Sequence, residues 1–257
     1  MRRAPSRRQF LAQAAAAAAC LTGPRAQAGT GEAGASGRVV EVRHARWHVR
    51  GVVGRRVVKA MLERGLMRLT GQGSAAEAWR RIVSPGERVG IKFSKVSRNA
   101  SGANQALGDA IIRGLMQAGV RRERIIVVEA WGAGFPGTGE FDGCYGPEVD
   151  TGLARVRLSR FVREQIDALI SVPDLKPHPR LGASGSRSNV ALATTIIDAP
   201  WHLHGAHLAD HVAAIYALPA IAGKCRLHVL NGLAPGRCGG LALSLDAAAL
   251  DAELSEC

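Results

Sequence analysis

Side chains able to do chemistry follow the apolar runs of this sequence, where buried strands would end. Lys92 closes one run, Glu129 closes the next, and Lys176 and His178 follow a third. In an open α/β sheet, ligands bind where the carboxyl ends of the strands meet. Lysines suit carboxylate or phosphate groups, and a histidine or glutamate can exchange protons with a substrate. These four residues therefore predict a catalytic site for a small anionic substrate.

A second interpretation gives the same residues no chemical role. Lysines that follow a strand are commonly solvated loop residues, and Lys92 and Lys95 fit that description. Two prolines make the segment 176–179 resemble a rigid exposed turn. Residue types alone leave both interpretations open.

Another group of residues has the spacing of metal ligands. His202, His204, His207 and His211 are four of the chain's eight histidines and fall within ten residues. In a helix that begins near Ala206, His207 and His211 lie one turn apart on one face, where two imidazoles can bind one ion. The cluster predicts a divalent transition metal such as zinc, copper or nickel. The alternative is that these histidines pack a loop or face the solvent.

Two further motifs indicate loops. The segment 132–137 spells G-x-G-x-x-G after a strand, but its proline prevents the glycines from opening a helix, as a dinucleotide site requires. The segment 184–186, Ser-Gly-Ser, lacks the G-x-S-x-G context of a serine hydrolase. We therefore predict a small-residue loop at 184–186 and expect no hydrolase.

The cysteines narrow the choice of cofactor. Four remain after the N-terminal region, and none belongs to a C-x-x-C pair: Cys144, Cys225, Cys238 and Cys257. Clustered thiolates normally hold iron–sulfur clusters and structural zinc, so we expect no self-contained iron–sulfur cluster. In an oxidising compartment the four cysteines have three possible disulfide connectivities, which the sequence does not distinguish.

The first 28 residues have the pattern of an export signal. Arg7 and Arg8 precede Phe10, an alanine-rich apolar run follows, and the segment 26–28 is an A-x-A cleavage site. Paired arginines before an alanine-rich run favour the twin-arginine translocase over general secretion. We expect cleavage after Ala28 and a periplasmic or otherwise extracytoplasmic product that is not an integral membrane protein.

The net charge of +13 depends largely on this N-terminal region. Removing residues 1–28 takes away five arginines and no acid, which leaves a formal charge of about +8. The remaining basic residues are spread along the chain, and aromatic residues make up only 4% of it. A surface that stacks on bases needs clustered charge and aromatic rings, so we expect no nucleic-acid partner.

Residues 29–37 read as a flexible linker, and residues 38–257 as one domain in which strand and helix patterns alternate. We expect strands at 39–42, 88–93, 125–129, 168–172 and 227–231, and helices at 55–69, 74–83, 103–118, 206–218 and 247–254. Continuous apolar strands separated by helices indicate an α/β fold with a single, mostly parallel sheet covered by helices on both faces.

Several of these blocks resemble, in sequence and in order, the family catalogued as domain of unknown function 362. The blocks are Val89-Gly90-Ile91-Lys92, Pro173-Asp174-Leu175-Lys176-Pro177-His178, Trp201-His202-Leu203-His204-Gly205, Ala217-Leu218-Pro219 and Ser244-Leu245-Asp246. The resemblance covers essentially all of the chain after the export signal, with a divergent and shortened C-terminal part. It implies an α/β fold, twin-arginine export, in some members an association with iron–sulfur proteins, and no established activity.

Motifs and resemblance together predict an exported protein of this family, a metal- or redox-linked enzyme that acts on a small anionic substrate. The alternative is a non-catalytic periplasmic accessory protein that binds a metal or another ligand. A third possibility is a decayed paralogue that keeps only the fold.

Overall fold

The computed structural model describes residues 37–94, 102–128, 145–174, 176–178, 181–196, 207–233 and 239–253. The predicted export signal and nearly all of the linker lie outside these ranges. Glu129, His202 and His204 lie outside them as well, as do three of the four cysteines, the glycine motif at 132–137 and Lys95.

A six-stranded sheet forms the centre of the molecule. In spatial order its strands are β1 (Val39–Arg43), β13 (Gly240–Ser244), β12 (Cys225–Asn231), β8 (Ala168–Val172), β4 (Val89–Phe93) and β5 (Ile125–Val128). The strands β12, β8, β4 and β5 are parallel, whereas β13 runs antiparallel to both of its neighbours. The predicted α/β fold with a mostly parallel sheet is confirmed. The strand β13, which lies between β1 and β12 and runs antiparallel to both, was not predicted.

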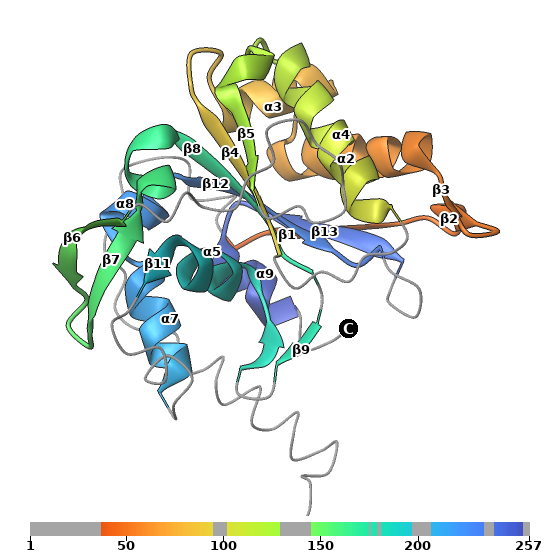
Figure 1. The fold of residues 1–257 in the computed structure, drawn as a ribbon. Coiled ribbons are helices and arrows are strands. Elements are labelled where there is room, and N and C mark those ends of the chain that lie inside the picture. The colour runs from red at the N-terminus through yellow and green to blue at the C-terminus, as the bar shows by residue number, and fades with distance from the viewer. Residues whose placement is uncertain are drawn as a thin grey trace, which may run out of the picture.

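Helices cover both faces of this sheet, as predicted (Figure 1). One face carries α2 (Arg55–Thr70), α3 (Ala75–Ile82) and α4 (Ala103–Gln117). The other carries α5 (Ser186–Thr194), α7 (Leu208–Tyr216), α8 (Pro219–Ala222) and α9 (Ala247–Glu253), with a π-helical turn η2 (Phe161–Gln165). The strands alternate their side chains between two apolar clusters, one under each helical layer.

Two glycines allow close packing in these layers. A β-carbon at Gly114 of α4 would collide with the Trp79 indole of α3, so these two helices can approach only because no side chain is present there. A β-carbon at Gly90 of β4 would lie 2.6 Å from Phe161. Both sites lie against fully buried aromatic rings, which explains why small residues interrupt these apolar segments.

Smaller elements complete the fold. They are a three-stranded sheet of β6 (Tyr145–Asp150), β7 (Arg155–Ser159) and β11 (Thr195–Ile196), the hairpins β2 (His48–Val49) with β3 (Val52–Val53) and β9 (Lys176–His178) with β10 (Gly182–Ser184), and η1 (Arg122–Arg124). The predicted loop at 184–186 is wrong, because Ser186 opens helix α5. The helix was missed since its first turn is polar and its apolar part spans only a few residues.

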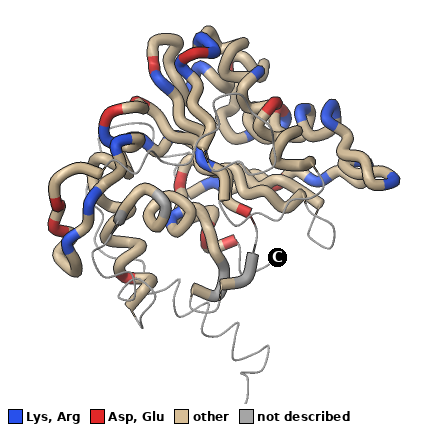
Figure 2. Tube along the Cα trace, viewed as in Figure 1, with Lys and Arg blue, Asp and Glu red and all other residues tan. Residues whose placement is uncertain are grey.

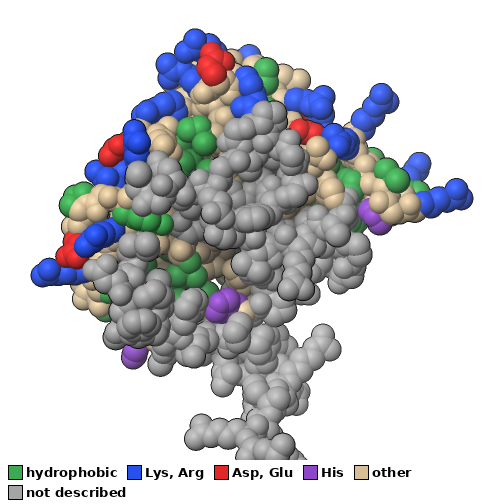
Figure 3. All heavy atoms as spheres, in the orientation of Figure 1, with side chains coloured by type: hydrophobic (Ala, Val, Ile, Leu, Met, Phe, Trp, Pro, Cys, Tyr) green, Lys and Arg blue, Asp and Glu red, His purple; other side chains and the backbone are tan. Residues whose placement is uncertain are grey.

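Exposed arginines lie on both sides of the molecule (Figures 2 and 3). Some lie on the layer of α2, α3 and α4 and on the β2–β3 hairpin, and Arg155, Arg157 and Arg160 lie on and directly after β7. Across the described ranges, no helix combines the length and the apolar character needed to cross a bilayer.

Candidate functional site

Polar side chains form a row across the interior of the sheet. Lys92 of β4, Ser171 of β8, His228 of β12 and Ser244 of β13 pair in register from strand to strand, so their side chains share one face. All four residues are at most 1% exposed. Buried polar groups are costly without partners, and the helices α5, α7 and α9 cover this face of the sheet.

Lys92 finds its partners in helix α5. Its Nζ donates to the carbonyl oxygen of Phe93 at 2.5 Å and to Oδ1 of Asn189 at 3.1 Å. Asn189 Nδ2 in turn donates to Lys92 O at 3.2 Å and to Ser171 Oγ at 3.1 Å. The interpretation of Lys92 as a solvated loop lysine is therefore wrong: its side chain is enclosed and held by specific contacts.

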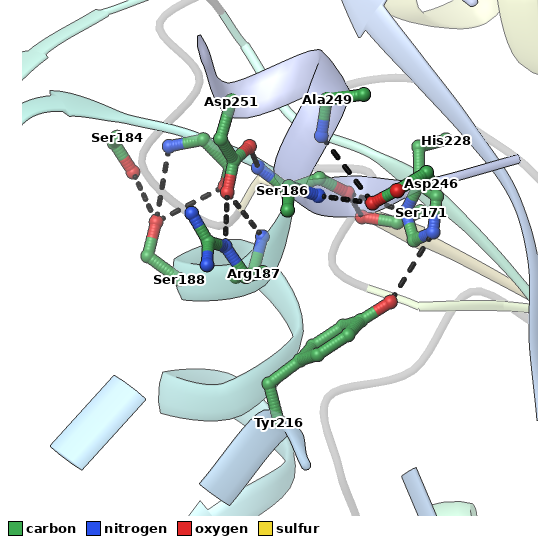
Figure 4. Close-up of polar contacts among 12 residues, drawn as sticks. Ser171, Ser184, Ser186, Arg187, Ser188, Tyr216, His228, Asp246, Ala249 and Asp251 are labelled. Carbon is green, nitrogen blue, oxygen red and sulfur yellow. Dashed lines mark hydrogen bonds and ion pairs between the residues drawn. The ribbon is translucent and has the colours of Figure 1, made fainter. Parts of the chain in front are cut away.

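His228 lies between two hydroxyl groups (Figure 4). Its Nδ1 is 2.6 Å from Ser186 Oγ, and its Nε2 is 3.2 Å from the Tyr216 hydroxyl. Ser186 Oγ also donates to Ser171 Oγ at 2.9 Å. Burial lowers the pKa of His228 to about 4, so the imidazole is neutral at pH 7. Burial likewise raises the pKa of Tyr216, which keeps its proton.

A carboxylate from helix α9 holds the start of α5. Asp251 accepts from the backbone nitrogens of Ser186 at 2.5 Å and Arg187 at 3.2 Å, and from Arg187 Nε at 3.0 Å. Asp246 caps α9 by accepting from the backbone nitrogen of Ala248 at 2.8 Å. Burial raises the pKa of Asp251, while its contacts with Arg187 act in the opposite direction. The contacts of Asp251 with Ser186 and Arg187 hold the start of α5 over the polar row.

A second polar cluster lies at the carboxyl edge of the sheet. Asn231, the last residue of β12, donates from Nδ2 to Asn104 Oδ1 at 2.7 Å and to Asp174 Oδ1 at 3.3 Å, and its Oδ1 accepts from Leu233 N at 3.1 Å. Asn104 lies in the first turn of α4, and Asp174 follows β8. Asn231 thus joins the ends of two strands to the N-terminus of a helix.

The β9–β10 hairpin carries two of the predicted catalytic residues from the end of β8 toward α5. Lys176 pairs with Ser184 and His178 with Gly182 along the hairpin. His178 Nδ1 accepts from the backbone nitrogen of Leu181 at 3.2 Å, which leaves the proton of a neutral imidazole on Nε2. The predicted rigid turn is thus a strand.

The predicted metal ligands are described in part. His207 is the N-cap of α7, and the His211 backbone nitrogen donates to its carbonyl oxygen at 3.1 Å, so the two residues lie one turn apart as predicted. His207 Nδ1 is 3.4 Å from Asp210 Oδ2. Among the residues that the structure describes, Nδ1 of His211 is buried and has no hydrogen-bond partner. Within the described ranges, no group of three or more His, Cys, Asp or Glu side chains is placed to hold a metal ion.

Sequence reasoning missed Ser171, Ser186, Asn189, Tyr216 and His228. A signal was present, because a polar residue interrupts each of three apolar strands. Such residues are rare in strands buried on both faces and indicate a polar network. The partners in α5 could not be found in this way, since they depend on tertiary packing.

Comparison of the chain with models of protein families and with curated proteins gives no match. The resemblance to family 362 therefore stays a prediction. The arrangement of the residues is what supports a function.

Proposed function

We propose that the carboxyl edge of the central sheet binds a small anionic substrate and that the protein acts on it by acid–base chemistry. The observation that carries the proposal is the junction at Asn231, which joins the ends of β8 and β12 to the first turn of α4 at this edge. Ligands of open α/β sheets bind at this edge.

The charges at this edge favour an anion. Lys92, the next-to-last residue of β4, contributes a buried ammonium group from the α5 side of the sheet. The N-terminus of α4 adds partial positive charge from its first amides on the opposite side. Gly102, the N-cap of α4, has no side chain that could accept from those amides. Among the described residues that contact Asn231, Asp174 contributes the only carboxylate, and Asn231 donates to it.

His178 is the proposed proton carrier. Its ring is half-buried, and the contact with Leu181 orients it with the exchangeable proton on Nε2. A histidine titrates near neutral pH, which suits a general acid or base. In this proposal His178 exchanges a proton with the substrate while Lys92 stabilises its negative charge.

Calorimetric titration of the mature protein with inorganic phosphate and with malonate tests the proposal. We expect Asn104→Ala to weaken binding of the anion at least tenfold, because it disrupts the junction with Asn231. Gln105→Ala is the matched control: it changes the next residue of α4, which contacts Arg55 instead, and should bind as the parent does. A parent protein that binds neither anion would overturn the proposal, as would equal binding by both variants.

We also propose export by the twin-arginine translocase to an extracytoplasmic compartment, on the pattern of the first 28 residues. Replacing Arg7 and Arg8 by lysine should leave the full-length precursor in the cytoplasm. The control replaces Arg2 and Arg3, outside the motif, and should not affect export. Equal export of both variants would contradict the proposal.

A metal-binding accessory role is the second candidate. The buried Nδ1 of His211, which has no hydrogen-bond partner in the described part of the chain, favours it, and His207 lies one turn away. Zinc content of the protein purified after export tests this role. We expect stoichiometric zinc in the parent and none in the His207→Ala, His211→Ala double variant. Absence of metal from the parent would exclude the role.

A further inference from the structure

The β2–β3 hairpin presents two valines to the solvent. Val49 and Val52 are 50% and 69% exposed, and they form a cross-strand pair, so their side chains share one face of the hairpin. On the opposite face, Val53 packs against the apolar cluster under α2, α3 and α4. Of the four large apolar side chains that are exposed in the described ranges, two are this pair. The hairpin therefore concentrates apolar surface where the rest of the molecule avoids it.

The turn between these valines contains a strained arginine. Its two central residues, Arg50 and Gly51, have φ angles of 51° and 82°, as a two-residue type I′ turn requires. Glycine and asparagine adopt this conformation readily, whereas an arginine is strained in it. Among the residues that the structure describes, Arg50 is the only one besides glycines with a positive φ. An arginine where asparagine would fit better indicates that the charge has a role.

The base of the hairpin is held by the body of the molecule. The backbone nitrogen of Gly54 donates to Trp47 O at 2.7 Å, and the backbone nitrogen of Trp47 donates to His44 O at 3.2 Å. The Trp47 indole is buried, and its ring centroid lies 5.0 Å from that of His48. The hairpin projects outward beyond the start of α2 (Figure 1). A fixed base and a projecting tip present Arg50 and the valine pair together to a partner.

Arginines surround this tip. The segment 43–56 contains no aspartate or glutamate and five exposed arginines: Arg43, Arg46, Arg50, Arg55 and Arg56. Arg43 pairs with Glu41, and Arg55 pairs with Asp109 of α4. Even with these two carboxylates counted, the segment keeps a strong positive charge. Figure 3 shows basic side chains extending from the hairpin beside apolar ones.

We propose that the β2–β3 hairpin is a docking surface for a lipid bilayer that carries anionic phospholipids. The arginines of the segment 43–56 contact the headgroup phosphates. Val49 and Val52 enter the boundary between headgroups and acyl chains, where apolar side chains leave water. The inference is independent of the ligand site proposed at the carboxyl edge of the sheet.

A nucleic acid is the alternative partner for a basic hairpin, and the residues favour the bilayer. A nucleic acid offers the same phosphates but no apolar layer for the valine pair. Surfaces that bind single strands also stack aromatic rings on bases, and the indole of this segment, Trp47, is buried. A bilayer accounts for both the charge and the exposed valines.

Vesicle flotation of the protein without residues 1–28 tests the proposal. Every described contact lies within residues 37–253, so this protein keeps all of them. We expect binding to vesicles of mixed phosphatidylglycerol and phosphatidylcholine, and at least tenfold weaker binding to phosphatidylcholine alone. Replacing Val49 and Val52 together by threonine keeps the β-branched shape and should weaken binding to the mixed vesicles at least fivefold. Leu153→Thr, at an exposed apolar side chain next to β7, is the matched control and should bind as the parent does.

Arg50→Asn tests the charge without disturbing the turn. Asparagine tolerates a positive φ, so the variant should melt no lower than the parent, yet bind the mixed vesicles about fivefold more weakly. Arg113→Gln removes one exposed charge from α4 and should bind as the parent does.

Equal binding of the mixed vesicles by the parent, the valine double variant and Arg50→Asn would overturn the proposal, and so would equal binding of the two kinds of vesicle by the parent. Short duplex DNA is titrated in parallel. Binding of DNA that weakens in Arg50→Asn, together with vesicle binding that does not depend on the valines, would assign the hairpin to nucleic acid and overturn the membrane role.

Discussion

Lys92 and Phe93 are neighbours in β4, yet they point to opposite faces of the sheet and meet different surroundings. Phe93 joins an uninterrupted apolar cluster under α2, α3 and α4. Lys92 joins a row of polar groups held by α5. An apolar face stabilises the fold by excluding water, whereas a buried polar face contributes little net stability. Both faces hold an apolar cluster, and only the α5 side also buries a row of polar groups. We propose that this row serves the ligand site.

The largest loss of stability is expected from a substitution in the apolar cluster under α2, α3 and α4. Phe93→Ala removes a fully buried ring and should lower the free energy of unfolding by about 3–5 kcal/mol. Urea denaturation monitored by circular dichroism measures the loss. Val52→Ala, at a side chain that is 69% exposed, is the control and should change little. A loss below about 1 kcal/mol for Phe93→Ala would contradict the distinction between the faces.

The next effect concerns the ion pair that holds α5 over the polar face. Arg187→Ala leaves the Asp251 carboxylate without its cation and should cost about 3 kcal/mol at pH 7. The pKa of Asp251 is already raised by burial and should rise further in the variant. Protonation removes the unpaired charge, so the cost should be smaller at pH 4 than at pH 7. Urea denaturation of the parent and of Arg187→Ala at both pH values measures this loss of stability. An equal loss at pH 4 and pH 7 would show that the unpaired charge is not its cause.

His228 should make stability depend on pH. Its pKa is about 4 in the folded protein against an ordinary value of 6.5, so the unfolded chain binds the extra proton between these values. Stability should therefore fall by roughly 2–3 kcal/mol as the pH drops from 6.5 to 4. His228→Gln should flatten this part of the profile, and His44→Gln, at an exposed position, should not. Parallel profiles for parent and His228→Gln would refute the assignment.

The smallest effect is expected at the amino edge of the sheet. Arg88 donates to both carboxylate oxygens of Asp167, at 2.8 and 3.1 Å, and these bonds hold the pKa of Asp167 at about 2. The pair is largely exposed, so Arg88→Gln should cause only a slight loss of stability, and none at high salt. The difference from the parent should disappear as the pH falls from about 4 toward 2. A large loss of stability that does not depend on salt would contradict the expectation for an exposed ion pair.

The sequence predicted one face of the molecule far better than the other. Long apolar runs and amphipathic helices depend on local pattern, so α2, α4, β4 and β8 were predicted close to their observed bounds. On the polar face, the sequence pointed only to Lys92. The residues that cover the polar row, Ser186 and Asn189, come from a short helix with a polar first turn, which the sequence pattern did not reveal. Register between distant strands brings Ser171 beside His228, and no local pattern contains that information.

Phosphate binding by Lys92→Met and Phe93→Leu shows whether the polar row serves the ligand site, because these adjacent residues point to the two faces of the sheet. Both proteins are titrated by calorimetry after circular dichroism has shown that they are folded. We expect Lys92→Met to lose at least tenfold in affinity and Phe93→Leu to bind as the parent protein does. Equal affinity in Lys92→Met and the parent would contradict the claim that the polar face of the sheet serves the ligand site.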